Sequence, residues 1–486
     1  MKKALHKLLF LLLITYGSQS FAADLTWTSK AVVKLFVTQQ AWDLRQPWTK
    51  HRARQGTCTG FFIREGILTN AHCVVDATFI EMEIPGHPDK IEVVRKAVNH
   101  QTDLALVEPA QPLDIDLPTI TFGELPNLRD KVVTVGYPTG GRQVSYTEGV
   151  VSRIDVMRYV HSNINAPLVQ TDAPINVGNS GGPVFSDATG ECIGVATQKL
   201  SSGEGLGFFV PTPIIQQFLT DIKDGDVNGI PSLGTFFQSL ENPAARKVLQ
   251  MSDEQSGIRV RAIAKESTSD NVLETGDVLL SIDDHNIRND GQVPFGELGK
   301  IWLGYHVAVK QVGESMHVEV LRDGEIKEIE LELKPFRLTI VPRLPSYDVQ
   351  PEYEILGGLL FTVVEQNYLW SWGRKWSDKI PTSLKLYTGK LFGEDDLRQL
   401  VVISEIYNAS VNKGYGGAIE NVRVVKINDK EIFQISDVHE AIQTPLENGY
   451  HAIELEGNIH ITLDAEQVKE EETYIKQRYG IHKKAL

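Results

Sequence analysis

Short apolar runs separated by glycine dominate the first 211 residues of this 486-residue chain. Two of them lie at 31–37 and 59–70, and four more follow as KVVTVGYP, TEGVVSRI, ECIGVATQKL and GLGFFVPTP. Glycine between such runs allows tight turns, and β-branched residues favour extended backbone. Many short strands at regular spacing indicate an all-β sandwich or barrel.

The hydrophobic period becomes helical at residues 211–229. Five apolar residues of this stretch fall on one helical face: Ile214, Ile215, Phe218, Leu219 and Ile222. Aspartate, glycine and proline then interrupt the pattern up to Pro231. We therefore place a domain boundary near 228, so that the first domain covers 23–228.

A faint internal repeat follows this boundary. GDVLLSIDDHNI (276–287) resembles NVRVVKINDKEI (421–432), and each predicts two strands joined by an Asp-containing turn. Each also follows a glycine-centred apolar segment, at 232–237 and 356–361. The repeat predicts two similar modules, at 229–342 and 343–462. The charged tail, 463–486, is expected to be a solvated or frayed helix rather than an interaction element.

The N-terminus has the layout of a secretory signal peptide. Two lysines precede an uncharged run from Leu8 to Tyr16, and Ser20 and Ala22 are small residues suited to a cleavage site. The alternative is a membrane anchor, but the apolar run is well short of the ~20 residues that a span needs. We expect 1–22 to be removed and the protein to be exported, most simply to a periplasm, without stable membrane insertion.

Composition and motifs exclude several classes of function. The formal net charge of −15 argues against nucleic acid as a main partner, because phosphate binding needs a basic surface. No phosphate-binding loop, zinc-protease helix or spaced Cys/His cluster is present, and the 13 histidines are scattered. We therefore expect no metal and no cofactor.

Three separate stretches hold the residue types of a catalytic triad. LTNAHCV contains His72, NHQTDLALVE contains Asp103, and GNSGGP contains Ser180. This His, Asp, Ser order resembles that of the trypsin-like double β-barrel. Each residue alone also fits a structural histidine, a turn aspartate or a serine in a glycine-rich turn, but the ordered set favours a triad.

The chemistry explains why these residue types are needed. A serine hydroxyl is a weak nucleophile, so an imidazole must take its proton and return it to the leaving amine. A buried carboxylate fixes the imidazole tautomer. The N–H groups of Gly178 and Ser180 would form the oxyanion hole that stabilises the intermediate.

At this point the chain resembles the HtrA/Deg family of serine proteases. LTNAHCV, TDLALV, VGYPTGG, TEGVVSRID, QTDAPINVGNSGGPVF and GFFVPTPII stand in that family's order. The segments IPSLGTFFQSLENPAARK and ILGGLLFTVV look most like plant members with two PDZ-like domains. The resemblance implies a mainly β chain, with a trypsin-like double β-barrel before two PDZ-like α/β modules.

The resemblance also implies a biological role. Such proteases need no ATP, cleave unfolded or damaged proteins, and assemble as trimers or hexamers. Their PDZ-like domains capture C-terminal or exposed apolar peptide segments. In this chain Leu233, Gly234 and Thr235 would bind the peptide carboxylate. The second glycine loop, at 356–360, could either bind a carboxylate in the same way or be an ordinary turn between strands. The segment 39–55 is short where periplasmic members often carry a long regulatory loop.

Three further assignments follow from the resemblance. Pro174 would lie at the base of the pocket for the residue before the cleaved bond (P1), so no acid there favours lysine or arginine. Small or medium aliphatic residues are expected instead, against a wall made by Ile175, Val195, Ala196 and Thr197. Thr197 would also orient the Asp103 carboxylate, unless it is a plain strand threonine.

The three cysteines fit a related pattern. A Cys58–Cys73 disulfide would occupy the place where trypsin-like proteases staple the strands beside the catalytic histidine. Cys192 would then be the odd thiol, and the alternative is three reduced cysteines.

Two other functions stay open. The PDZ-like modules could act as a chaperone or scaffold with secondary protease activity, or the protease could process one specific client. The second module also contains a tryptophan cluster expected to serve assembly or local packing: Trp370, Trp372 and Trp376.

Overall fold

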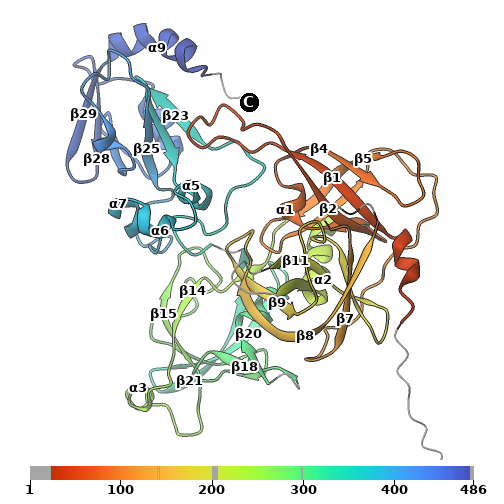
Figure 1. The fold of residues 1–486 in the computed structure, drawn as a ribbon. Helices are drawn as coiled ribbons and strands as arrows, with labels where there is room; N and C mark the ends of the chain where they lie inside the picture. The colour runs from red at the N-terminus through yellow and green to blue at the C-terminus, as the bar shows by residue number, and fades with distance from the viewer. Residues whose placement is uncertain are drawn as a thin grey trace, which may run out of the picture.

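The computed structural model describes residues 23–138, 141, 143–199, 206–296, 299–335 and 337–481, so the expected signal peptide lies outside the described residues. Figure 1 shows two barrels in red to yellow-green, then a green-to-cyan lobe and a blue C-terminal lobe. The structure is mainly β, as the sequence predicts. None of the helices within the described ranges is long and apolar enough to cross a membrane.

The first six strands close into a barrel in the order β1-β2-β3-β6-β5-β4. They are β1 (Val32–Gln39), β2 (Arg54–Ile63), β3 (Gly66–Thr69), β4 (Ala77–Glu83), β5 (Ile91–Asn99) and β6 (Leu104–Pro109). The one-turn helix α1 (Ala71–Val74) follows β3. Val33, Leu35 and Ile67 are fully buried in its core, because alternate side chains of a barrel strand point inward.

The next six strands close into a second barrel in the order β10-β11-β12-β9-β8-β7. They are β7 (Lys131–Gly136), β8 (Ser145–Arg158), β9 (Asn165–Thr171), β10 (Pro183–Ser186), β11 (Cys192–Lys199) and β12 (Gly207–Pro211). Phe61 of the first barrel shares one apolar cluster with Val135 and Leu168 of the second. The open choice between sandwich and barrel is thus settled as a double barrel with a common core.

Helix α2 (Thr212–Asp221) closes the barrel region at the place where the period predicts a helix. Ile214, Ile215 and Phe218 are completely buried in the cluster that the two barrels share. Leu219 and Ile222 are only partly buried against it. The helix therefore covers the second barrel with the apolar face that the sequence predicts.

The first module after the barrels has a six-stranded sheet in the order β14-β15-β16-β20-β21, with β17 paired to β16, and two short two-stranded sheets. Its elements are β13 (Pro231–Ser232), β14 (Thr235–Gln238), α3 (Pro243–Val248), β15 (Ile258–Ile263), β16 (Val278–Ile282), β17 (His285–Asn286), β18 (Gln292–Pro294), β19 (Lys300–Trp302), α4 (Gly304–Ala308), β20 (Ser315–Arg322), β21 (Glu325–Glu332) and β22 (Lys334–Pro335). Tyr305 and Val307 of α4 share a cluster with Val169 of the second barrel. Barrel and module are therefore packed together through a continuous core.

The second module holds two sheets, β23-β24-β25 and β27-β26-β28-β29. Its elements are β23 (Tyr353–Leu356), β24 (Leu359–Val363), α5 (Gln366–Trp370), α6 (Trp376–Lys379), α7 (Thr382–Tyr387), β25 (Val401–Ile406), β26 (Val424–Ile427), β27 (Lys430–Glu431), α8 (Ile435–Ala441), β28 (Tyr450–Leu455), β29 (Ile459–Asp464) and α9 (Ala465–Tyr479). Trp372 and Trp376 lie at the edge of an internal apolar cluster that includes Ile380 and Leu384. Local packing accounts for these two rings, and the expected assembly contact stays a prediction.

The internal repeat appears as two matching hairpins, β16–β17 and β26–β27. The two turn residues of each hairpin have positive φ angles: Asp283 at 41°, Asp284 at 64°, Asn428 at 46° and Asp429 at 68°. Two central residues with φ > 0 form the turn whose twist matches a β-hairpin, and Asp and Asn tolerate it well.

The charged tail packs more closely than the sequence suggests. The Asp464 carboxylate caps α9 by accepting from the N–H groups of Glu466 and Gln467. Ile475 is only 3% exposed within the core of the second module, and the Tyr479 hydroxyl donates to the Asn408 carbonyl at 3.0 Å. The buried Ile475 side chain and the Asp464 cap thus hold α9 on the second module, although its charged composition predicted a solvated helix.

A loop of the first barrel also reaches the second module, and Figure 1 shows this β1–β2 connection extending toward β23. Trp48 is 7% exposed and lies between Tyr353 and Tyr407, with ring centroids 5.7 and 5.5 Å away. The Tyr407 hydroxyl donates to the Arg45 carbonyl at 2.6 Å. The short segment 39–55 thus holds the C-terminal module against the first barrel.

Candidate active site

His72 and Asp103 meet at one end of the first barrel. His72 lies on α1 directly after β3, and Asp103 immediately precedes β6. His72 Nδ1 donates to Asp103 Oδ2 at 2.8 Å, and the His72 backbone N–H donates to Asp103 Oδ1 at 2.9 Å. These two bonds fix both the imidazole tautomer and the ring orientation.

Asp103 is almost fully buried and adopts a left-handed backbone with φ 55°. Thr197 Oγ1 donates to its Oδ2 at 2.5 Å, and Asn70 Nδ2 donates to its carbonyl at 2.9 Å. Burial by itself would raise the Asp103 pKa, but the charge of His72 and the hydrogen bonds of His72 and Thr197 lower the pKa to about 2. The carboxylate is therefore ionised at neutral pH.

His72 responds to this charge. Burial would lower the pKa of the imidazole, but the nearby Asp103 carboxylate and its hydrogen bond raise the pKa above the ordinary 6.5. About a third of the side chain, 31%, stays exposed. The ring is thus held on one side and open on another, as an acid–base group needs to be.

Ser180 lies beside Thr197 of β11. Its hydroxyl donates to the Thr197 carbonyl at 2.9 Å. Among the described side chains, no hydrogen bond joins Ser180 to His72. Ser180 therefore lies beside Thr197, the residue whose hydroxyl binds Asp103. The Ser180 hydroxyl is itself hydrogen-bonded to a backbone carbonyl.

The turn around Ser180 is supported from the first barrel. Gly178 has φ 102°, and among the described residues neither the Gly178 N–H nor the Ser180 N–H donates to a backbone carbonyl. Thr59 Oγ1 donates to the Gly178 carbonyl at 2.7 Å, and the Thr59 N–H donates to the Ser180 carbonyl at 2.9 Å. A Cβ at Gly181, where φ is 84°, would lie 2.1 Å from the Thr59 carbonyl. The turn and β2 are packed too closely for any side chain there.

A disulfide joins Cys58 and Cys73, with Cα atoms 6.0 Å apart, and it ties β2 to the helix that carries His72. Cys58, His72 and Cys73 lie near one another, but the two bonded sulfurs are not thiolates and cannot hold a metal as such. Cys192 is free and buried, and burial raises the pKa of its thiol to about 12.

The residues expected to line the P1 pocket divide into two groups. Ile175 and Ala196 are buried in the same apolar cluster, and a Cβ at Gly207 would lie 2.9 Å from the Ile175 side chain. Val195 packs instead in the core that the two barrels share. Adjacent residues of a strand face opposite sides, so Val195 and Ala196 do not form one wall.

Comparison with known proteins identifies the family. A trypsin-like peptidase domain model matches residues 58–195, and a PDZ domain model matches 341–485. Protease Do-like 2, chloroplastic, of Arabidopsis thaliana is 36% identical over 468 residues, covering 93% of this chain and 74% of the relative. This chain belongs to the Do-like, or HtrA/Deg, family of serine proteases. It is therefore a serine endopeptidase, as the motifs predict.

Two further relatives show the breadth of this similarity. Protease Do-like 4, mitochondrial, of the same plant is 33% identical over 436 residues, covering 89% of this chain and 79% of its own. A probable periplasmic serine endoprotease, DegP-like, of Pseudomonas fluorescens is 29% identical over 301 residues, 58% of this chain and 57% of its own. Do-like proteases thus include both organellar and periplasmic members.

In this Do-like protease, the loop expected to bind a peptide carboxylate opens strand β14. Gly234 has φ 69°, and its N–H donates to Ser232 Oγ at 3.1 Å. Leu233 is 5% exposed, and Thr235 pairs with Ile263 at the start of β14. Two guanidinium groups lie near the ring of the following residue, Phe236: Arg261 at 5.1 Å and Arg343 at 6.0 Å.

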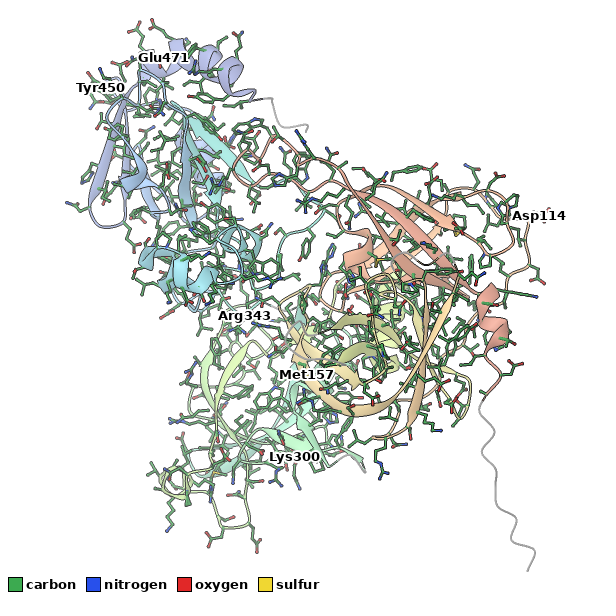
Figure 2. All side chains as sticks on the ribbon, in the orientation of Figure 1. Asp114, Met157, Lys300, Arg343, Tyr450 and Glu471 are labelled. Carbon is green, nitrogen blue, oxygen red and sulfur yellow. A yellow bond between two sulfur atoms is a disulfide. The ribbon has the colours of Figure 1, made fainter. Side chains whose placement is uncertain are left out.

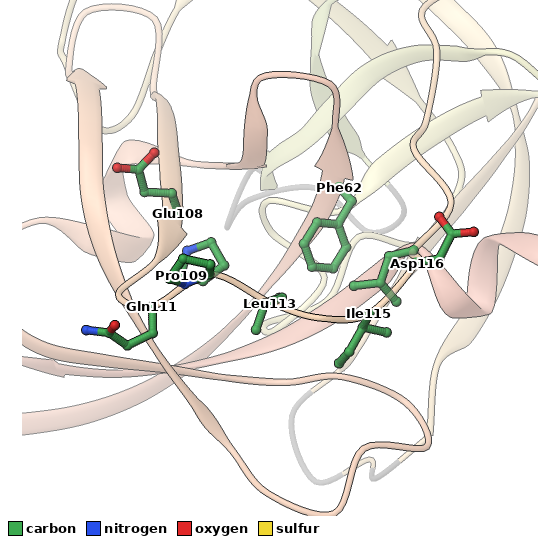
Figure 3. A pocket seen from close by; sticks show the side chains of 9 residues that line it. Phe62, Glu108, Pro109, Gln111, Leu113, Ile115 and Asp116 are labelled. Atoms are coloured by element: carbon green, nitrogen blue, oxygen red, sulfur yellow. The ribbon is translucent and has the colours of Figure 1, made fainter.

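A surface hollow of about 440 Å³ lies under the segment 108–117, lined by Phe62, Pro109, Leu113 and Ile115 among others (Figure 3). It contains none of the residues expected to carry catalysis. The candidate site of this protease lies instead where His72 and Asp103 of the first barrel meet the Ser180 turn of the second. Sequence reasoning did not find Thr59 or Asn70, because a single threonine or asparagine carries no recognisable pattern.

Proposed function

We propose that Ser180 is the nucleophile of this endopeptidase, that His72 is its general base and acid, and that Asp103 orients His72. The arrangement that supports this most strongly is the His72–Asp103 pair at 2.8 Å beside the Ser180 turn. The N–H groups of Gly178 and Ser180 would receive the negative charge that develops on the substrate oxygen.

The first step requires the Ser180 hydroxyl to leave the Thr197 carbonyl and rotate toward the free ring nitrogen of His72. Hydrogen bonds of this kind commonly tighten only when substrate is bound. His72 takes the serine proton as Oγ attacks the peptide carbonyl, and then gives it to the departing amine. In the second half His72 takes a proton from a water molecule as the water oxygen attacks the acyl carbonyl, and it then returns the proton to Ser180 Oγ as the ester bond breaks and the acid product leaves. The vacated Thr197 carbonyl is then available to a substrate N–H.

For specificity we propose small or medium aliphatic residues at P1. Ile175, Ala196 and the neighbouring Gly207 make a confined apolar surface, and Pro174 brings no charge to it. An apolar pocket discriminates by only about 1–3 kcal/mol per methylene, so the preference should be graded.

For the biological role we propose degradation of unfolded or damaged polypeptides after export, without ATP and in a homo-oligomer. The signal-like residues 1–22 and a periplasmic DegP-like relative support export. The C-terminal segment of an extended chain could add to β14, because β14 is the edge strand of its sheet. The plant relatives that are chloroplastic or mitochondrial make an organelle the alternative compartment.

The test compares wild type with Ser180→Ala on one protein in its native form and in its reduced, unfolded form. Wild type should cleave the unfolded form much faster, and Ser180→Ala should lose about 10⁶ in kcat while still binding it. A variant that keeps a tenth of the activity would remove Ser180 from the mechanism. Equal rates on both forms would contradict the role in degrading unfolded proteins, and dominant cleavage after lysine or arginine would contradict the P1 proposal.

A further inference from the structure

The linker between the two PDZ-like modules lies against the candidate active site. The His161 ring, in the turn between β8 and β9, is centred 6.2 Å from the His72 ring. Tyr347 of the linker stacks on His161 with centroids 4.4 Å apart and planes 8° from parallel. The Tyr347 hydroxyl also donates to the His161 carbonyl at 2.8 Å. The linker, which lies outside both barrels, thus contacts His161, the residue whose ring lies beside His72.

The neighbouring linker residue, Asp348, anchors a chain of hydrogen bonds that ends at the same ring. His100 Nε2 lies 2.9 Å from Asp348 Oδ2, and His100 Nδ1 lies 3.0 Å from His161 Nε2. Because a carboxylate only accepts, His100 Nε2 must donate to it. His100 Nδ1 then accepts from His161 Nε2 when both rings are neutral. Asp348 therefore selects the tautomer of both histidines.

Asp348 is itself tightly fixed. Arg95 pairs with its Oδ1 at 2.5 Å, and it exchanges backbone–carboxylate hydrogen bonds with Asp76 in both directions. Burial would raise the Asp348 pKa, but the hydrogen bond from His100 and the charge of Arg95 lower the pKa to about 2. Burial lowers the pKa of His161 to about 4. At neutral pH the chain thus begins at an ionised carboxylate and ends at a neutral imidazole.

The linker is also held along its length. Asn163, from the same turn as His161, donates to the Arg343 carbonyl at 3.3 Å. Gln350 donates to the Pro47 carbonyl at 2.8 Å in the loop that carries Trp48. Figure 2 shows Arg343 where the barrels and the two modules come together. The position of Tyr347 therefore depends on how the second module is docked.

We propose that Tyr347 and Asp348 are positioning residues for peptide hydrolysis: they hold the His161 ring against His72 and keep His72 directed toward Ser180. The proposal rests on the proposed roles of His72 and Ser180. It makes the docked linker part of the working active site, so that release of the second module weakens catalysis although all three triad residues are still present.

The experiment measures kcat and KM of the full chain on a short chromogenic peptide, together with the rate at which a fluorophosphonate labels Ser180. Tyr347→Ala and Asp348→Ala should each lower kcat and the labelling rate by roughly 10- to 100-fold, the scale of a misplaced catalytic group, with KM nearly unchanged. Tyr347→Phe keeps the stacked ring and should restore most of the rate. Tyr474→Ala, on the exposed side of α9, is the matched control and should behave as wild type.

Thermal melting of each variant separates positioning from unfolding, since the assays are run well below the melting temperature. Wild-type kcat and labelling in both alanine variants would overturn the proposal, as would a change confined to KM. A loss that Tyr347→Phe does not restore would also overturn the stacking role. If wild type itself is neither hydrolytic nor labelled, the proposed function fails instead, which keeps the two failures distinguishable.

Discussion

The two PDZ-like modules carry similar glycine loops but present them differently. In the first module the loop leads into β14, which is the edge strand of its sheet. In the second the loop leads into β24, which is paired with β23 on one side and β25 on the other. Addition of a peptide strand needs a free row of backbone groups. Of the two strands that follow the glycine loops, only β14 offers one, because β24 is paired on both sides.

The modules also differ in what they touch. The first packs helix α4 on the second barrel through Tyr305 and Val307. The second is held through Trp48 and through the linker beside His161. Similar sequence segments thus lie in modules that contact the barrels in different ways, and we propose peptide capture only for the first.

The largest expected effect separates capture from hydrolysis. Asp103→Asn should lower kcat by about 10⁴, because the imidazole loses the carboxylate that sets its tautomer and stabilises its charge. Peptide binding at β14 should be unchanged, as measured by fluorescence anisotropy of a labelled C-terminal peptide. A parallel loss of binding would mean that capture and catalysis share one site.

A second effect should fall only on the C-terminal module. Trp48→Ala removes a buried aromatic ring from between Tyr353 and Tyr407 and should destabilise this docking by about 3–5 kcal/mol. Hydrogen exchange of β23 and β25 should accelerate, while β14 keeps its peptide affinity. Trp48→Phe serves as the milder control. Unchanged exchange in the alanine variant would show that the linker alone holds the module.

Matched glycine substitutions provide a third test of the difference between loops. A Cβ at Gly234 would lie 2.1 Å from the Ser267 side chain, and a Cβ at Gly358 would lie 2.3 Å from the Tyr407 carbonyl. Gly234→Ala should weaken peptide binding about tenfold, equivalent to 1.4 kcal/mol. Gly358→Ala should lower stability but leave peptide affinity unchanged. Titration calorimetry that finds the reverse would assign capture to the second module.

The smallest effect concerns pH. His72 must be neutral to accept a proton, and Asp103 raises its pKa above 6.5, so activity should begin to fall at a higher pH than a free histidine would give. Well below the pKa of His72 the rate should fall about tenfold for each further pH unit, as in any single titration. Peptide capture at β14 should stay flat over this range. A flat rate profile, with chemistry shown to be limiting, would exclude His72 as the base.

Local patterns predicted much of this architecture. The helical face at Ile214, Ile215 and Phe218 and the repeated hairpin turns were readable because period and turn chemistry act over a few residues. The order of His72, Asp103 and Ser180 likewise predicted which residues the fold would bring near one another. The oxyanion role of Gly178 stays a prediction.

Contacts between segments that are far apart in the chain could not be predicted from the sequence. Thr59 supports the Ser180 turn across 119 residues, and nothing in its neighbours distinguishes it. Tyr347 reaches His161 from 186 residues away and belongs to no motif. Val195 was assigned to the wrong side of its strand, because the pocket was argued from a run of residues rather than from alternate positions.

The packing of Trp48 between two distant tyrosines has a consequence for how the chain folds during synthesis. Arg45 and Tyr407 touch although 362 residues separate them, so the loop that carries Trp48 emerges from the ribosome long before its partner. At about 5–20 residues per second, the interval is roughly 20–70 seconds. Throughout it the nascent chain carries an aromatic side chain with nowhere to pack. The loop between β1 and β2 is therefore among the first to be translated and among the last to be packed.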